Sequence, residues 1–281
     1  HDREMVRFSG HILVSRLFGF AYANAAVFIV GFGLGAVAVG FYRAASRIAG
    51  AAFEAINEPS RTILLSSLRN ADAAAPALDE ARTRLAERLV PIILSLAAPV
   101  MVLLAVMAEP AIHFLLGDRW LPAAPVVSIL SIAYLVKLMM IIIEPLFSLR
   151  GRPQYYRNLV ICGSVISSLC LLAAVPFGMV AAAMSELVAS IIVSAISLYA
   201  ASRWAGFSIA VLVRTLWLPV AGLIVMALGT VLIRDRLLLA GWPDLAIIVL
   251  AGLTLLIVYF IIMWFNRSFR EVVKGLYARQ S

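Results

Sequence analysis

The stretch FYRAASRIAGAAFEAINEPSR, residues 41–61, carries three arginines and two glutamates within a very apolar chain. The 281 residues are 63% hydrophobic and only 14% charged, with a mean hydropathy of +1.01, whereas soluble domains are about 25% charged. Apolar blocks of about 20 residues match a hydrocarbon layer of ~30 Å. The sequence therefore predicts an all-α polytopic membrane protein. The charged stretch 41–61 is an exception to its apolar character.

Eight membrane-spanning helices are predicted from these blocks. They cover residues 11–30, 40–66, 89–108, 124–147, 158–176, 179–200, 211–233 and 245–265. Lys and Arg gather in the head, the tail and alternate loops and are scarce in the other loops, so the positive-inside rule places both chain ends in the cytoplasm. The chain begins with His1 rather than Met, and we expect it to be a piece of a longer protein.

The charges of the 40–66 span are predicted to lie on one face. At about 100° per residue, they fall in a stripe about 60° wide. The stripe holds Arg43, Arg47, Glu54, Glu58 and Arg61, and the opposite face holds Ala45, Ile48, Ala52, Ile56 and Ile63.

A helix lying flat at the interface is the alternative, but the alternation of basic and non-basic loops requires a crossing here. Each charge facing lipid at mid-bilayer costs ~2.5–3.5 kcal/mol. The stripe is therefore predicted to face protein or a water-filled cavity. Pro59 is expected to break the helix near its cytoplasmic end. The basic loop 67–88 that follows is interpreted as a short helix on the membrane surface.

Other spans add further ionisable candidates. Arg16 and Asn24 lie in the first span, where Arg16 is either a snorkelling anchor or part of the cavity wall. Lys137 and Glu144 are seven residues apart in the fourth span, hence on one face. They are expected either to neutralise each other as a buried pair or to extend the charged path. Glu186 is interpreted as an isolated interfacial residue.

Arginine and carboxylate together favour an anionic substrate and an ion-linked cycle. Guanidinium groups match phosphate oxygens in a two-pronged geometry and stay protonated. Glu54 and Glu58 would balance their charge and are the candidates for coupling to a proton or another ion. No His/Cys metal cluster or catalytic triad can be drawn, and GFGLG (31–35) follows no strand, so no metal or cofactor is expected. The basic tail indicates a membrane-surface anchor rather than nucleic-acid binding.

Three stretches resemble bacterial polysaccharide transporters, in the same order along the chain. They are GAVAVGFYRAASRIA (35–49), GDRWLPAAPVVSIL (117–130) and LRGRP (149–153). These transporters are the lipid-linked oligosaccharide flippases of the multidrug/oligosaccharidyl-lipid/polysaccharide exporter superfamily. The resemblance covers nearly the whole chain but only the C-terminal lobe of a two-lobed protein, so an N-terminal lobe would be missing. The family's polar Asn-x-Asp-like run is replaced here by ANAAVF, in which only Asn24 remains.

The resemblance implies a transporter of the bacterial inner membrane rather than an enzyme. It would move undecaprenyl-pyrophosphate-linked oligosaccharide for lipopolysaccharide, capsule or exopolysaccharide synthesis, through a cavity that opens alternately to cytoplasm and periplasm. The expected partners are the anionic lipid-linked oligosaccharide, a proton or other coupling ion, membrane lipids, the N-terminal lobe and a polysaccharide polymerase. The substrate path would include Arg16, Asn24, Arg43, Arg47 and Arg61.

Two alternatives stay open. A membrane-embedded polysaccharide polymerase or ligase should carry catalytic side chains on a sizeable periplasmic loop, which the predicted topology lacks. A drug or cation antiporter of the same superfamily would favour an acidic cavity with few arginines.

Overall fold

The computed structural model describes residues 25–71, 77–239 and 242–264, which form helices and no strand. The helices are α2 (Ala25–Arg69), α3 (Leu78–Val106), α4 (Ala108–Leu116), η2 (Asp118–Ala123), α5 (Ala124–Lys137), η3 (Leu138–Ile142), α6 (Ile143–Ser148), α7 (Pro153–Ala174), η4 (Val175–Phe177), α8 (Met179–Ala205), α9 (Ile209–Leu239) and α10 (Asp244–Trp264). Within these ranges, seven helical segments are long and apolar enough to cross a membrane. The predicted all-α polytopic membrane fold is confirmed. Residues 11–24 of the first predicted span lie outside the described part of the chain.

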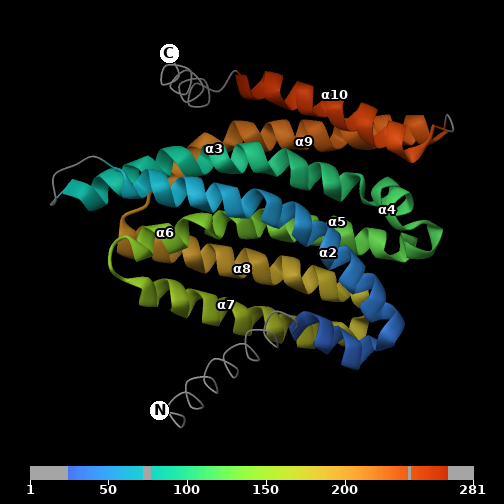
Figure 1. The fold of residues 1–281 in the computed structure, drawn as a ribbon, viewed down its shortest axis with the longest axis horizontal. Coiled ribbons are helices and arrows are strands. Elements are labelled where there is room, and N and C mark those ends of the chain that lie inside the picture. Colours follow the sequence, from blue (N-terminus) through green and yellow to red (C-terminus); the bar gives the residue numbers. More distant parts are fainter. Residues whose placement is uncertain (1–24, 72–76, 240–241, 265–281) are drawn as a thin grey trace, which may run out of the picture.

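The helices lie roughly along one direction, with α5 in the interior (Figure 1). α2, α3 and α8 pack against α5, α7 packs against α8, and α9 packs against both α3 and α10. Val126, Val127 and Leu130 of α5 are almost completely buried. A helix that is apolar on all sides belongs in the interior of a membrane bundle, which explains this central position.

α2 consists of two helical arms that meet at Gly35, where the chain changes direction (Figure 1). Gly35 has φ 83° and ψ 177°, a conformation that glycine alone adopts without strain. A Cβ atom on Gly31 would lie 3.1 Å from Cγ2 of Val39, so the two arms face each other beside the turn. The turn thus lies between the predicted spans 11–30 and 40–66.

The predicted break at Pro59 is wrong, because the second arm continues through Pro59 to Arg69. A proline removes one backbone hydrogen bond, and membrane helices tolerate that loss. The interpretation of residues 67–88 as a separate surface helix is also wrong, since residues 78–88 are the first turns of α3. Asp79 and Glu80 in its first turn favour a helix start at this point through the helix dipole.

One end of the bundle is rich in arginine and contains Arg69, Arg82, Arg150 and Arg203. Two of these residues, Arg82 and Arg150, connect the ends of neighbouring helices. Arg82 of α3 donates from Nε to the carbonyl of Leu68 (3.2 Å) and from Nη1 to that of Leu149 (3.1 Å). Arg150 donates from Nη1 to the carbonyl of Trp204 (3.3 Å). Carbonyls in the last turn of a helix lack intrahelical partners. Guanidinium groups can donate hydrogen bonds to them. The ends of α2, α6 and α8 are therefore joined to one another.

At the far end of the bundle, His113 of α4 contacts two aspartates. Its Nε2 lies 2.8 Å from Oδ1 of Asp118, and its Nδ1 contacts Oδ2 of Asp244 at the start of α10. A neutral imidazole donates from one nitrogen only, whereas the imidazolium donates from both. The hydrogen bond to Asp244 and the negative charges of both aspartates raise the pKa of His113 above its usual value. In its charged form, the ring donates to both aspartates and connects α10 to α4 and η2.

This contact predicts a pH-dependent stability. Because the folded-state pKa is raised above the unfolded value of about 6.5, the contribution is fully present below pH ~6.5 and is lost as the pH rises through the folded pKa. Thermal unfolding of the purified chain between pH 5.5 and 9 should show Tm falling with rising pH, by about 2 °C for an exposed contact. In His113→Gln this component should disappear. Identical pH profiles of the two proteins would contradict the assignment.

Candidate functional site

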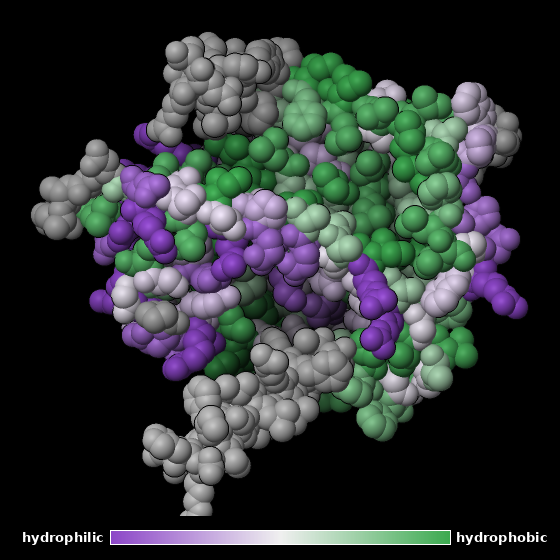
Figure 2. Space-filling view, in the orientation of Figure 1, coloured by the Kyte–Doolittle hydropathy of each residue, from purple (hydrophilic) through white to green (hydrophobic). Residues whose placement is uncertain are grey.

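The charged stripe of α2 lies on the exposed face of the second arm. Arg43, Arg47, Glu54 and Glu58 are exposed, and the Arg61 side chain is 35% exposed. Figure 2 shows hydrophilic residues gathered over the course of α2, among hydrophobic surface and beside a hollow. On the packed side, four residues are fully or almost fully buried: Ala45, Ala49, Leu64 and Leu68.

Ile63, assigned by periodicity to the face opposite the charges, is 58% exposed. It lies at the edge of the buried side and remains open to solvent or lipid. Arg16 and Asn24, the path candidates of the first span, lie outside the described residues.

Arg61 joins α2 to α6. Its Nη1 donates to both carboxylate oxygens of Glu144, at 2.8 and 2.9 Å, and its Nη2 donates to Glu58 at 3.3 Å. The expected pair between Lys137 and Glu144 is therefore wrong. The cause is η3, a 3₁₀ segment of 5 residues that separates the two. A 3₁₀ helix turns about 20° more per residue than an α-helix, which rotates Glu144 by about 100° away from the predicted face.

The three arginines of the stripe consequently differ in their surroundings. Arg61 is neutralised by two carboxylates. For Arg43 and Arg47, no ion pair and no side-chain hydrogen bond is found with any residue that the structure describes. These two guanidinium groups keep their full donor capacity for a ligand.

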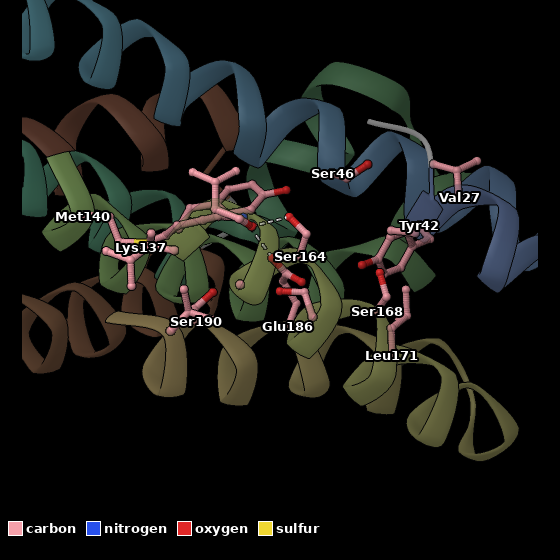
Figure 3. A pocket seen from close by; sticks show the side chains of 17 residues that line it. Val27, Tyr42, Ser46, Lys137, Met140, Ser164, Ser168, Leu171, Glu186 and Ser190 are labelled. Atoms are coloured by element: carbon pink, nitrogen blue, oxygen red, sulfur yellow. Dashed lines mark hydrogen bonds and ion pairs between the residues drawn. The ribbon is translucent and has the colours of Figure 1, made fainter. Parts of the chain in front are cut away.

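A second polar region lies inside the bundle, next to the stripe. It is a cavity of about 480 Å³ between α2, α5, α7 and α8. Figure 3 labels ten of the side chains that line it; nine come from these four helices, and Met140 comes from η3. Its polar lining consists of Tyr42, Ser46, Tyr134, Lys137, Ser164, Ser167, Ser168, Glu186 and Ser190.

Lys137 and Glu186 form an ion pair in the cavity wall. Lys137 Nζ lies 3.2 Å from Oε1 of Glu186, and the two side chains point toward each other (Figure 3). The Glu186 side chain is only 16% exposed, against 43% for Lys137. Lys137 Nζ also lies 5.8 Å from the centroid of the Tyr134 ring, within cation–π range. The interpretation of Glu186 as isolated is wrong.

Ser190 adds an unsatisfied polar atom to the same cavity. It is 3% exposed, and its Oγ is buried without a hydrogen-bond partner among the described residues. Buried polar groups in proteins are almost always hydrogen-bonded, to protein, water or an ion. The cavity wall therefore has capacity for a further polar guest. Within the described ranges, no cluster of His, Cys, Asp and Glu has the arrangement of a metal site.

α2 links the two polar regions. Tyr42 and Ser46 line the cavity, while Arg43 and Arg47, their chain neighbours, lie on the exposed stripe. A change in the cavity that displaces this part of α2 would thus move both arginines with it.

The comparisons with known proteins bear on the first part of the chain. Residues 1–125 match the model of a family described as polysaccharide biosynthesis protein. No curated protein and no solved structure matches the chain. The matched segment contains the Gly35 turn and the entire charged stripe of α2. Over residues 1–125, the chain is therefore similar to proteins of the polysaccharide biosynthesis protein family.

Proposed function

We propose that the chain is the C-terminal lobe of a bacterial inner-membrane flippase. Its substrate would be an oligosaccharide linked to undecaprenyl pyrophosphate, carried outward by alternating access for lipopolysaccharide, capsule or exopolysaccharide synthesis. The family match supports a role in polysaccharide synthesis, and the multi-pass helical fold supports a site in the membrane. The observation that carries the proposal is the pair Arg43 and Arg47, exposed on a membrane-spanning helix without ion-pair partners among the described residues.

Within the membrane, Arg43 and Arg47 have to face water or protein. Each charge facing lipid at mid-bilayer would cost ~2.5–3.5 kcal/mol, so the exposed face of α2 has to be covered in the complete transporter. An N-terminal lobe across a water-filled passage would cover it. In that passage, Arg43 and Arg47 would hold the pyrophosphate through charge-assisted hydrogen bonds. Arg61, already paired with Glu58 and Glu144, would mainly keep α2 against α6.

Carboxylates would couple the cycle to an ion gradient. Glu54 and Glu58 are exposed on the stripe and remain candidates for this role. The structure adds Glu186, which is more enclosed than either and has Lys137 as its counter-ion. Loss of the Glu186 charge would release Lys137 at the wall formed with α2, which offers a physical link between ion binding and movement of the stripe.

The side of the membrane on which substrate accumulates tests the proposal. Depleting the protein in its natural host should leave lipid-linked oligosaccharide in the inner leaflet, where a membrane-impermeant oxidant added to spheroplasts cannot reach it. Restoring the wild-type protein should clear this material. A polymerase or ligase would instead leave unpolymerised oligosaccharide in the outer leaflet, open to the oxidant, and that result would overturn the proposal.

A further inference from the structure

We infer that the coupling ion is a proton and that Lys137 is the residue that keeps metal cations out of the cavity. The inference rests on the proposed function, since it names the ion of that transport cycle. The cavity itself, however, is a feature of the described residues, and its ion preference can be measured without any transport.

Apart from Lys137, the cavity has the chemistry of a site for a hard cation. Glu186 supplies a carboxylate, and five serine hydroxyls line the same space. The Oγ of Ser190 is buried without a partner among the described residues. Oxygen atoms of this kind are the ligands that hard metal cations prefer. A sodium ion beside Glu186 would therefore find the oxygen ligands that it needs.

Lys137 occupies the place that such a cation would take. Its Nζ lies 3.2 Å from Oε1 of Glu186, so a sodium ion on the same carboxylate would face a second positive charge at short range. The ammonium group is also attached to the chain, which gives it an effective local concentration far above that of dissolved sodium. The ammonium group of Lys137 thus excludes a free sodium ion from the Glu186 carboxylate.

A proton competes with Lys137 through charge alone, because it needs neither the space nor the ligands of a metal cation. It binds Glu186 covalently, needs no shell of ligands and removes the charge that holds Lys137. The other titratable groups lining the cavity are Tyr42 of α2 and Tyr134 of α5, whereas α7 contributes serines as its polar residues. Among the described lining residues, Glu186 is thus the single carboxylate that a proton can neutralise. Proton binding and opening of the Lys137 contact become one event.

Thermal unfolding of the full chain in nanodiscs tests the inference, with sodium chloride compared against choline chloride at equal ionic strength. Wild type should show no sodium-specific change in Tm. Lys137→Gln should gain a saturable, sodium-specific rise of about 3–5 °C, because a bound ion stabilises the folded state. The double variant Lys137→Gln/Glu186→Gln should lose this rise, and Lys137→Arg should behave as wild type.

A saturable sodium-specific rise in the wild-type Tm would overturn the inference, as would a folded Lys137→Gln that gains none. If Lys137→Gln does not fold, the wild-type protein still tests the inference. Its Tm should depend on pH, and part of this dependence should be absent in Glu186→Gln. Sodium should leave the wild-type Tm unchanged. A pH profile unchanged in Glu186→Gln would then overturn the inference. These outcomes are independent of the substrate, so the proposed flippase function can fail or stand separately.

Discussion

Arg47→Ala is expected to lower oligosaccharide export by about 10- to 150-fold, because a hydrogen-bonded contact to a charged group contributes about 1.5–3 kcal/mol. The protein should remain folded and abundant, since Arg47 is exposed and has no ion-pair partner among the described residues. Export is measured as surface polysaccharide in cells that carry the substitution in the chromosomal copy. Arg84→Ala is the matched control, since Arg84 is also exposed and, within the described part of the chain, forms an ion pair only with exposed Glu80.

Two further variants separate binding from structure. Arg47→Lys keeps the charge but loses the planar fork, and it should fall between wild type and Arg47→Ala. Arg61→Ala should behave differently, with less folded protein, because it leaves Glu144 without its guanidinium partner. Normal polymer export in a folded Arg47→Ala protein would rule out the stripe as the pyrophosphate path.

Glu186→Gln is expected to abolish the response of transport to an imposed pH gradient. Glutamine fills the same space but cannot take up and release a proton, and it leaves Lys137 without its ion pair. The assay is export of lipid-linked oligosaccharide in proteoliposomes that contain the complete transporter, with and without the gradient. Tm measured beside activity shows whether the variant is folded.

Glu54→Gln and Glu58→Gln are the controls for this prediction, since both carboxylates are exposed on the stripe. They should reduce substrate transport moderately and keep its dependence on the gradient. If Glu54→Gln or Glu58→Gln uncouples transport while Glu186→Gln does not, the coupling site lies on the stripe and not in the cavity.

Much of the fold was predictable because a membrane imposes a simple length rule. A span needs about 20 apolar residues, so the positions of α5, α7, α8, α9 and α10 follow from the apolar blocks. The stripe of α2 was predictable for a similar reason, since a long regular helix keeps a constant angle per residue. The GFGLG stretch likewise contains Gly35, the residue at which the chain turns.

The cavity was not predictable from local pattern. Its ion pair joins two residues that are 49 positions apart in the sequence and lie on different helices. Periodicity within one helix carries no information about such a partner. The misplaced Glu144 has a local cause, because η3 interrupts the α-helical angle that the prediction assumed. The one available signal was that Lys137 and Glu186 are opposite charges inside separate apolar spans, where unpaired charges are costly.

The most direct test measures whether position 54 of α2 is surrounded by water or by lipid when the protein is in the membrane. A spin label on Glu54→Cys, with Cys162 and Cys170 changed to serine, is compared with a label on Ile257→Cys, an apolar residue of α10 that is 59% exposed. In membranes that contain the complete transporter, the label at 54 should collide with a water-soluble nickel chelate, and the label at 257 with lipid-dissolved oxygen. Oxygen-dominated relaxation at both positions would contradict a charged stripe that faces a water-filled passage.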